Sequence, residues 1–477
     1  MDPVALFQQV AASVPAYRAF LAENSIDPEK IRTFQDFVRL PMTTKETYTR
    51  RHPLPDLCRD GVIGDIVAVS SGSTGEPSFW PRSAADEQVI AARFEEVFRD
   101  SFAAHERRTL AVVCFALGTW VGGLFTVDCC RHLAARGYPI TVVAPGTDRR
   151  EILRVLPELA PHFDQVVLLG YPPFLKNVID TEDLPWHRWN IRLVTAGEVF
   201  SEEWRTLVAG RAGIEDPVRG IASLYGTADA GVLGNETPLS VEIRRFLSDR
   251  PDAARELFRE SRLPTLVQYD PAVRFFEEHQ GTLLFSGDNG VPLIRYHIAD
   301  EGGLVAYDEM LAFVRRHGFE PAARGPERPF VYVFGRSHFT VSYYGANVFP
   351  ENIAIGLEQP AISGRVTGKF VLEVSEDADR DRHLTVTVEL MPGEKPAEEI
   401  AQAAGESILT QLLRLNSEFA HYVPPARQAP FIRLRESGDP EYFPPGAKHR
   451  YTRAADAGTG PRPGDHVHRL SARSQRR

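Results

Sequence analysis

The chain has 477 residues, of which 43% are hydrophobic and 25% are charged, and its formal net charge is −10 at pH 7. This length and composition predict a globular protein of more than one domain, and the charge argues against nucleic acid or an anionic membrane as the main partner. No run of residues approaches the roughly 20 apolar positions of a membrane-spanning helix, so we expect no membrane association.

The cysteines and the N-terminus indicate a cytoplasmic protein. The cysteines have no C-x-x-C or zinc-ligand spacing, and three of the four lie in apolar surroundings, which is typical of reduced, buried thiols. The first residues show no basic segment followed by an apolar run, so we expect no signal peptide. The four cysteines are Cys58, Cys114, Cys129 and Cys130.

Residues 1–50 are expected to form short helices. Apolar residues recur at helical spacing between Val10 and Leu21. Thr33 is placed to cap a short amphipathic turn, and the segment from Pro41 to Glu46 has the pattern of an N-cap that opens another short helix.

The segment Ser70–Pro77 follows the apolar run 66–69 and has the composition of an anion-binding loop. Its glycines can adopt positive φ and let backbone amides approach a ligand, and its hydroxyl groups can turn toward phosphate oxygens. A solvated Ser/Gly turn has the same composition, and the Gly-Lys-Ser/Thr ending of the nucleotide triphosphatase P-loop is missing. The candidate anion-binding residues are Ser70, Ser71, Gly72, Ser73, Thr74 and Gly75.

Helical and strand-like segments alternate from about residue 87 to residue 235. Helical patterns at 87–102 and 149–159, and a third that ends near Gly137, separate short apolar runs. Apolar runs between helices indicate parallel strands that are buried on both faces. The fold class is therefore α/β, with layered mixed sheets and helices. The expected strands are 110–115, 140–143, 165–170 and 191–197.

Residues 239–262 form a charged insertion, for which we expect helices with a solvated face. Arg244 and Arg245 are among its charged residues. After the insertion, the segments 266–269, 282–285 and 293–306 have the pattern of antiparallel strands.

The last third of the chain predicts a small α+β domain. The alternating segments 369–374 and 384–390 predict a hairpin, an apolar stripe at 400–419 predicts a helix, and 431–434 predicts a further strand. We therefore expect a large domain over 1–334, a small domain over 335–456 and a disordered tail over 457–477.

Small or polar residues gather in further segments where structure alone would not require them. The acidic residue that ends Ser223–Asp229 can hold a magnesium ion or cap a helix. Asp300, at the end of an apolar strand, can bind a ribose diol or belong to an ordinary turn. Lys448 lies in a loop rich in Pro and Gly, where a lone basic residue is usually solvated.

In this order and at these separations, the segments resemble the adenylate-forming (acyl-activating) superfamily, and most closely its phenylacetate–CoA ligase branch. The resemblance spans most of residues 10–455 and rests on the ordered set rather than on any one motif. The segments that carry it are Leu40–Glu46, Ser70–Pro77, Gly122-Gly123, Gly170–Leu175, Ala196–Glu198, Tyr225–Asp229, Pro292–Asp300, Gly335–Ser337 and Gly345–Ile353.

The resemblance implies a large adenylation domain and a small mobile C-terminal domain. It implies that ATP and Mg²⁺ activate a carboxylic acid as an acyl-adenylate with release of pyrophosphate, and that the acyl group then passes to a thiol, here CoA. The loop at 70–75 would hold the ATP phosphates, Asp229 the magnesium ion, and Arg336 the ribose or a phosphate. Lys448 would bridge the acyl carboxylate and the α-phosphate. The other nucleotide-binding residues would be Gly197, Glu198, Tyr225, Gly226, Thr227 and Asp300.

The resemblance also implies an acid pocket and a thiol channel. An aromatic lining suits an aryl or arylacetic acid, although the same side chains are equally suited to an ordinary core. Gly345 would line the channel, where a residue without a side chain lets a pantetheine arm pass. The pocket would be built from Phe115, Trp120, Gly122, Gly123, Tyr171 and Phe174.

Several residues depart from the family pattern and leave alternatives open. Glu76 stands where a lysine is common, His338 where an acidic hinge residue is usual, and Asp229 in place of a glutamate. Lys448 lies one residue further from its glycine than usual. The alternatives are transfer to a carrier-protein thiol or an amine, and a catalytically weak nucleotide-binding homologue. A homodimer is also left open.

Overall fold

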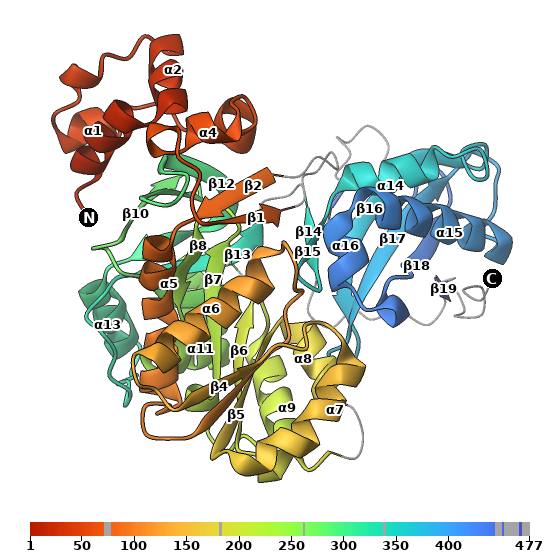
Figure 1. Ribbon diagram of the computed structural model, residues 1–477. Coiled ribbons are helices and arrows are strands. Elements are labelled where there is room, and N and C mark those ends of the chain that lie inside the picture. The colour runs from red at the N-terminus through yellow and green to blue at the C-terminus, as the bar shows by residue number, and fades with distance from the viewer. Residues whose placement is uncertain are drawn as a thin grey trace. The chain divides into compact units, whose positions relative to one another are not determined.

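The computed structural model describes residues 1–70, 78–180, 184–260, 263–336, 340–443, 451–452 and 467–469 (Figure 1). These residues divide into two compact units, one made of Met1–Ser70 and Ser78–Gly335, and one that begins at Arg336. Among the described residues, no helix is long and apolar enough to cross a membrane. The four cysteines are buried free thiols, as the sequence predicts, and burial raises the pKa of Cys130 to about 12.

Short helices form the N-terminal part of the first unit, as predicted. Thr33 caps α3 in a capping box with Asp36, and Thr44 caps the turn η2. Thr43 joins this part to strand β12, since its amide donates to the Arg295 carbonyl at 3.1 Å and its carbonyl accepts from the His297 amide at 2.8 Å. The elements are α1 (Pro3–Ser13), α2 (Pro15–Glu23), η1 (Pro28–Lys30), α3 (Phe34–Phe37), η2 (Lys45–Thr49), α4 (Leu54–Leu57) and η3 (Arg59–Gly61).

The first unit is built on an 11-stranded sheet with the order β10-β11-β12-β13-β9-β8-β7-β6-β5-β3-β4. The strands from β7 to β4 pair in parallel, and helices connect them, which confirms the predicted α/β class. These strands are β3 (Thr109–Val113), β4 (Ile140–Val143), β5 (Gln165–Gly170), β6 (Ile191–Ala196) and β7 (Ile221–Thr227). The helices along this part are α5 (Ala84–Glu96), η4 (Val97–Ser101), α6 (Val121–Ala135), α7 (Arg149–Leu159), α8 (Pro172–Ile179), α9 (Glu202–Ala212) and α10 (Pro217–Gly220).

The other half of the sheet is largely antiparallel, and its strands confirm those expected after residue 265. They are β8 (Gly231–Asn235), β9 (Thr265–Gln268), β10 (Arg274–His279), β11 (Thr282–Gly287), β12 (Leu293–Val305) and β13 (Phe330–Arg336), with helix α13 at Tyr307–Arg316.

The charged insertion forms two helices, α11 (Pro238–Asp249) and α12 (Pro251–Phe258), as expected. The expectation of a solvated face is wrong for Arg244, whose exposed fraction is 2%. Its guanidinium donates to Glu202 and to two backbone carbonyls, so its charge is compensated inside the protein.

The second unit contains the predicted α+β elements. Its larger sheet has the order β16-β17-β18-β19, with an antiparallel β16–β17 hairpin. The expected disordered tail is wrong for residues 467–469, which pair with β18, and the rest of the tail lies outside the described residues. The elements are β14 (Val341–Tyr343), β15 (Ala346–Val348), α14 (Pro350–Leu357), β16 (Val366–Glu376), β17 (Arg382–Leu390), α15 (Glu398–Leu415), α16 (Ser417–Tyr422), β18 (Phe431–Arg435) and β19 (Val467–Arg469).

Strand β12 is irregular beside Tyr296 and just before the candidate residue Asp300. Arg295 and Ala299 have φ values of 46° and 61°, in the left-handed region that residues with a Cβ rarely adopt. The pairing of β12 with β11 also shifts register twice. These irregularities flank Tyr296 and precede Asp300, so they determine how both side chains leave the strand.

We expect Ala299→Gly to raise the free energy of unfolding by about 0.5–1 kcal/mol, because relief of left-handed strain exceeds the entropy that glycine adds to the unfolded chain. Urea unfolding would measure the change. Ala19→Gly, at an exposed position within α2, is the matched control and should instead cost about 0.5–1 kcal/mol. A loss of stability in both variants would contradict strain at Ala299.

Candidate active site

A hairpin holds both ends of the Ser/Gly-rich segment. Strand β1 (Ile66–Ser70) pairs with β2 (Ser78–Arg82), and Ser70 lies opposite Ser78. The indole Nε1 of Trp80 donates to Ser70 Oγ at 2.9 Å, and the Val69 amide donates to the Thr119 carbonyl at 2.8 Å. Ser70 is therefore placed beside the start of α6. The candidate residues Ser71, Gly72, Ser73, Thr74 and Gly75 lie outside the described residues.

The carboxyl ends of β6 and β7 bring together the residues predicted to hold adenosine. Ala196 pairs with Leu224, so Gly197 and Tyr225 leave neighbouring strands at the same level. Gly197 has a φ of 86°, which favours glycine, and Glu198 is buried. The Tyr225 hydroxyl donates to Asp300 Oδ2 at 2.8 Å, which joins β7 to β12.

The turn after Tyr225 is tight. A Cβ at Gly226 would lie 2.6 Å from the Gly231 carbonyl oxygen, so only glycine fits. The Ala230 amide donates to Thr227 Oγ1 at 3.1 Å and closes the turn. The turn presents Asp229, which is 1% exposed.

The Asp229 carboxylate has two compensating partners from distant segments. The Tyr296 hydroxyl donates to Oδ2 at 2.7 Å, and Lys45 Nζ lies 3.4 Å from Oδ1. Lys45 Nζ also lies 5.5 Å from the centroid of the Trp80 ring, whose face attracts a cation. The sequence does not predict this ion pair, because nothing in its spacing pairs residue 45 with residue 229.

Two buried arginines hold the backbone of the same turn. Arg82 donates to the Ala228 carbonyl at 2.6 Å, and Arg274 donates to the Ala230 carbonyl at 3.3 Å and to Asn289 Oδ1 at 2.7 Å. Burial, followed by the neighbouring Arg82 charge, lowers the pKa of Arg274 to about 10. Neither arginine was predicted, since each acts on carbonyl groups that any sequence supplies.

Asp229 fits a magnesium ion. Oδ1 accepts no hydrogen bond from the described residues, and the cation nearest to it among the ion pairs of these residues is Lys45 Nζ, at 3.4 Å. A buried carboxylate oxygen of this kind is a suitable ligand for Mg²⁺, which takes one or two carboxylates and fills its other positions with water and phosphate.

Aromatic and glycine residues from the predicted acid pocket also meet in the structure. The Phe115 and Tyr171 rings, which follow the neighbouring strands β3 and β5, lie edge to face with centroids 4.9 Å apart. A Cβ at Gly122 would lie 3.5 Å from the Phe115 side chain, and one at Gly123 would lie 2.2 Å from the Ala116 carbonyl oxygen. These glycines let α6 begin close to β3. Trp120 is buried immediately before α6, and Phe174 is buried in the first turn of α8.

The remaining candidates lie in or beside the second unit. Gly345 forms the β14–β15 turn with a φ of 82°. Arg336 ends β13, and its side chain is outside the described part. Lys448, Glu76 and His338 lie outside the described residues.

We expect Lys45→Met to lower the free energy of unfolding by about 1–3 kcal/mol, because a buried carboxylate loses its cation. A double-mutant cycle with Asp229→Asn, measured by urea unfolding, should give a coupling of about 1 kcal/mol.

Lys30→Met is the matched control. Its ion pair with Asp27 has side-chain exposures of 80% and 47%, so its loss should cost less than about 0.5 kcal/mol. Strict additivity of Lys45→Met and Asp229→Asn would show that the two side chains do not interact.

Comparison with known proteins supports the resemblance in the sequence, although no protein-family model matches the chain. Phenylacetate–coenzyme A ligase of Aromatoleum evansii is 23% identical over 397 residues, which are 80% of this chain and 78% of that protein. The enzyme of the same name from Thermus thermophilus is 26% identical over 361 residues, or 73% and 72% of the two chains.

A solved structure of 2-hydroxyisobutyryl-CoA ligase, in complex with 2-HIB-AMP and CoA, shares the fold. It is 17% identical, with a TM-score of 0.60, and the match covers 95% of this chain and 88% of that one. The motifs and the relatives agree: the chain is similar to phenylacetate–coenzyme A ligases, and it shares the fold of a CoA ligase of solved structure.

Proposed function

We propose that the protein uses ATP to activate an aryl or arylacetic acid as its acyl-adenylate and then transfers the acyl group to CoA. The observation that carries this proposal is the meeting of Asp229, Lys45 and Tyr296 beside the Tyr225–Asp300 pair, at the carboxyl ends of parallel strands. Ligands of open α/β sheets bind at such ends. The relatives named phenylacetate–coenzyme A ligase support the acid and the acceptor.

In this proposal the nucleotide lies along the ends of β6, β7 and β12. Asp300 binds the ribose hydroxyls, Tyr225 stacks on adenine, and Arg336 reaches the ribose or a phosphate. Gly197, Glu198, Gly226 and Thr227 shape the base site, and the loop Ser70–Gly75 holds the phosphates with its amides and hydroxyls.

Charge neutralisation dominates the first step. The acid's carboxylate oxygen attacks the α-phosphorus in line while pyrophosphate leaves, so positioned cations lower the barrier. Asp229 would hold Mg²⁺, which neutralises phosphate charge when bound. Because Lys45 approaches the same carboxylate, it adds a positive charge at a site where the loop carries Glu76 in place of a lysine.

The remaining candidate residues are assigned to binding the acid and the thiol. Phe115, Trp120, Tyr171 and Phe174, with Gly122 and Gly123, form an apolar lining that suits an aromatic ring. Lys448 bridges the acyl carboxylate and the α-phosphate. In the second step a thiol attacks the acyl carbon and AMP leaves, and Gly345 lines the path of the pantetheine arm.

We also propose the cytoplasm as the location, which agrees with the four buried free thiols. Transfer to a carrier protein or an amine, and a catalytically weak homologue, are not favoured, because the curated relatives bear the name of a CoA ligase.

Acid-dependent exchange of labelled pyrophosphate into ATP tests the proposal. We expect exchange with phenylacetate or benzoate analogues and none without acid. If a broad panel of aryl, arylacetic and aliphatic acids gave no exchange, the protein would not be an adenylating enzyme. Mass analysis of the product with CoA, a holo carrier protein or an amine would identify the acceptor.

Lys448→Ala separates the two steps. We expect exchange to fall by about 10²-fold or more, because a cation at the α-phosphate is lost, while a preformed acyl-adenylate still reacts with CoA. Equal loss of both steps would mean that another lysine has this role.

A further inference from the structure

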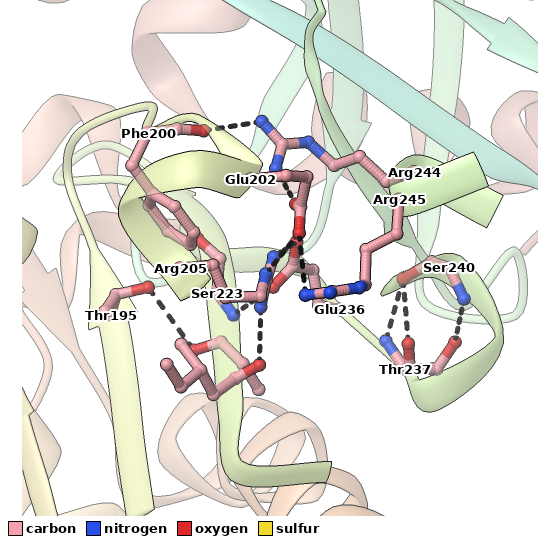
Figure 2. Close-up of polar contacts among 12 residues, drawn as sticks. Thr195, Phe200, Glu202, Arg205, Ser223, Glu236, Thr237, Ser240, Arg244 and Arg245 are labelled. Atoms are coloured by element: carbon pink, nitrogen blue, oxygen red, sulfur yellow. Dashed lines mark hydrogen bonds and ion pairs between the residues drawn. The ribbon is translucent and has the colours of Figure 1, made fainter. Parts of the chain in front are cut away.

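We propose that four buried charged side chains form a positioning network for the nucleotide-base site. The network consists of Glu202, Arg205, Glu236 and Arg244 (Figure 2). None of them was a predicted site residue, and none has a role in the chemistry above. The inference rests on the proposed function, in that the two loops it concerns are those assigned to adenine.

Arg205 lies at the centre of the network and is completely buried. Its Nε donates to Glu202 Oε2 at 2.9 Å, its Nη2 donates to Glu236 Oε1 at 2.7 Å, and its Nη1 donates to the Ile221 carbonyl at 2.6 Å. The guanidinium therefore joins the start of α9, the end of β8 and the start of β7.

Arg244 completes the network from the charged insertion. Its guanidinium donates to Glu202, to the Phe200 carbonyl and, through Nε at 2.7 Å, to the Pro264 carbonyl. Figure 2 shows Glu202 between Arg205 and Arg244. The Phe200 ring lies below both cations, with its centroid 4.9 Å from Arg205 Cζ and 5.7 Å from Arg244 Cζ.

The network bonds directly to the backbone of strand β7 and of the loop after β6. Glu236 Oε2 accepts from the Ser223 amide at 2.8 Å, and Ser223 lies two residues before Tyr225. Arg244 donates a hydrogen bond to the carbonyl of Phe200, which lies two residues after Glu198. Since β6 and β7 are adjacent parallel strands, one set of ion pairs holds both the loop after β6 and the part of β7 that leads to Tyr225.

A merely space-filling role does not explain these side chains. Buried charges lose hydration, and apolar residues of similar size are often as stabilising, so ion networks are better suited to fixing geometry than to adding stability. Burial raises the pKa of Glu202, but the ion pairs with Arg205 and Arg244 outweigh it and lower that pKa overall. The Glu202 carboxylate is therefore charged near neutral pH; it pairs with Arg205 and Arg244, and Arg245 Nη1 lies 3.7 Å from its Oε2.

Glu236→Gln is the decisive variant, because it keeps the size of the side chain and removes the charge that faces Arg205. We expect the Kd for ATP and for AMP to rise about tenfold, since small displacements of positioning groups have large effects. The Kd for inorganic tripolyphosphate, which has no base, should change by less than about twofold. General loosening of the fold would instead weaken the binding of all three ligands. Calorimetry would measure the affinities.

Amide hydrogen exchange tests the network in the absence of any ligand. In Glu236→Gln, exchange should rise in 197–201 as well as in 223–230, although the substitution lies beside only the second segment. Glu96→Gln is the matched control, because Glu96 is a half-buried carboxylate that also pairs with two arginines, Arg93 and Arg328, but lies at the end of α5. It should leave both segments and all three affinities unchanged.

Each outcome decides the inference. A folded Glu236→Gln with unchanged ATP affinity and unchanged exchange in 197–201 would overturn it. If Glu236→Gln does not fold, Phe200→Leu, which keeps the carbonyl and removes the ring, must raise the Kd for ATP and AMP, and no change would overturn it. If the wild-type protein binds neither ATP nor AMP, the proposed function is wrong, and hydrogen exchange alone decides whether the network holds the loops.

Discussion

A carboxylate buried away from water needs a compensating charge and hydrogen-bond donors, and the first unit satisfies this requirement at Asp229. Lys45 arrives from the N-terminal helices, Tyr296 from β12, and Arg82 and Arg274 from β2 and β10. Residues from four separate segments therefore meet at one turn. Gly226 lets the turn close tightly against Gly231, and the irregular part of β12 carries Tyr296, which bonds the carboxylate.

The polar interactions in this half of the protein fall into two layers. In the first layer, the Tyr225–Asp300 and Tyr296–Asp229 bonds link the segments of β7 and β12. In the second layer, the ion network of Glu202 and Arg205 holds β7 and the loop after β6. The first layer presents groups that would contact a nucleotide, and the second holds backbone groups of β7 and of the loop after β6. A rigid sheet with neutralised charges behind its loops is a preorganised site, which loses little freedom when it binds a ligand.

The elements of the fold were largely predictable from the sequence. Buried parallel strands are nearly continuous apolar runs, as in β3 and β5, and caps such as Thr33 and Thr44 satisfy amides within a few residues. The candidate site was predictable where a motif carried it, since Gly197, Tyr225 and Asp300 do meet. Contacts such as Lys45–Asp229 and Arg205–Glu236 were not, because pairing across a fold leaves no local pattern. Arg244 was misjudged for the same reason, since a charged helix gives no sign of which arginine turns inward.

The bond between Thr43 and β12 has a consequence for how the chain matures. The Thr43 hydroxyl donates to the Ile294 carbonyl across 251 positions of sequence. During synthesis the N-terminal helices are made first, yet their docking strand emerges only after most of the sheet has been translated. Contacts of such separation form late and slowly. The apolar residues of the N-terminal helices that pack against the later strands therefore stay exposed until those strands have been made.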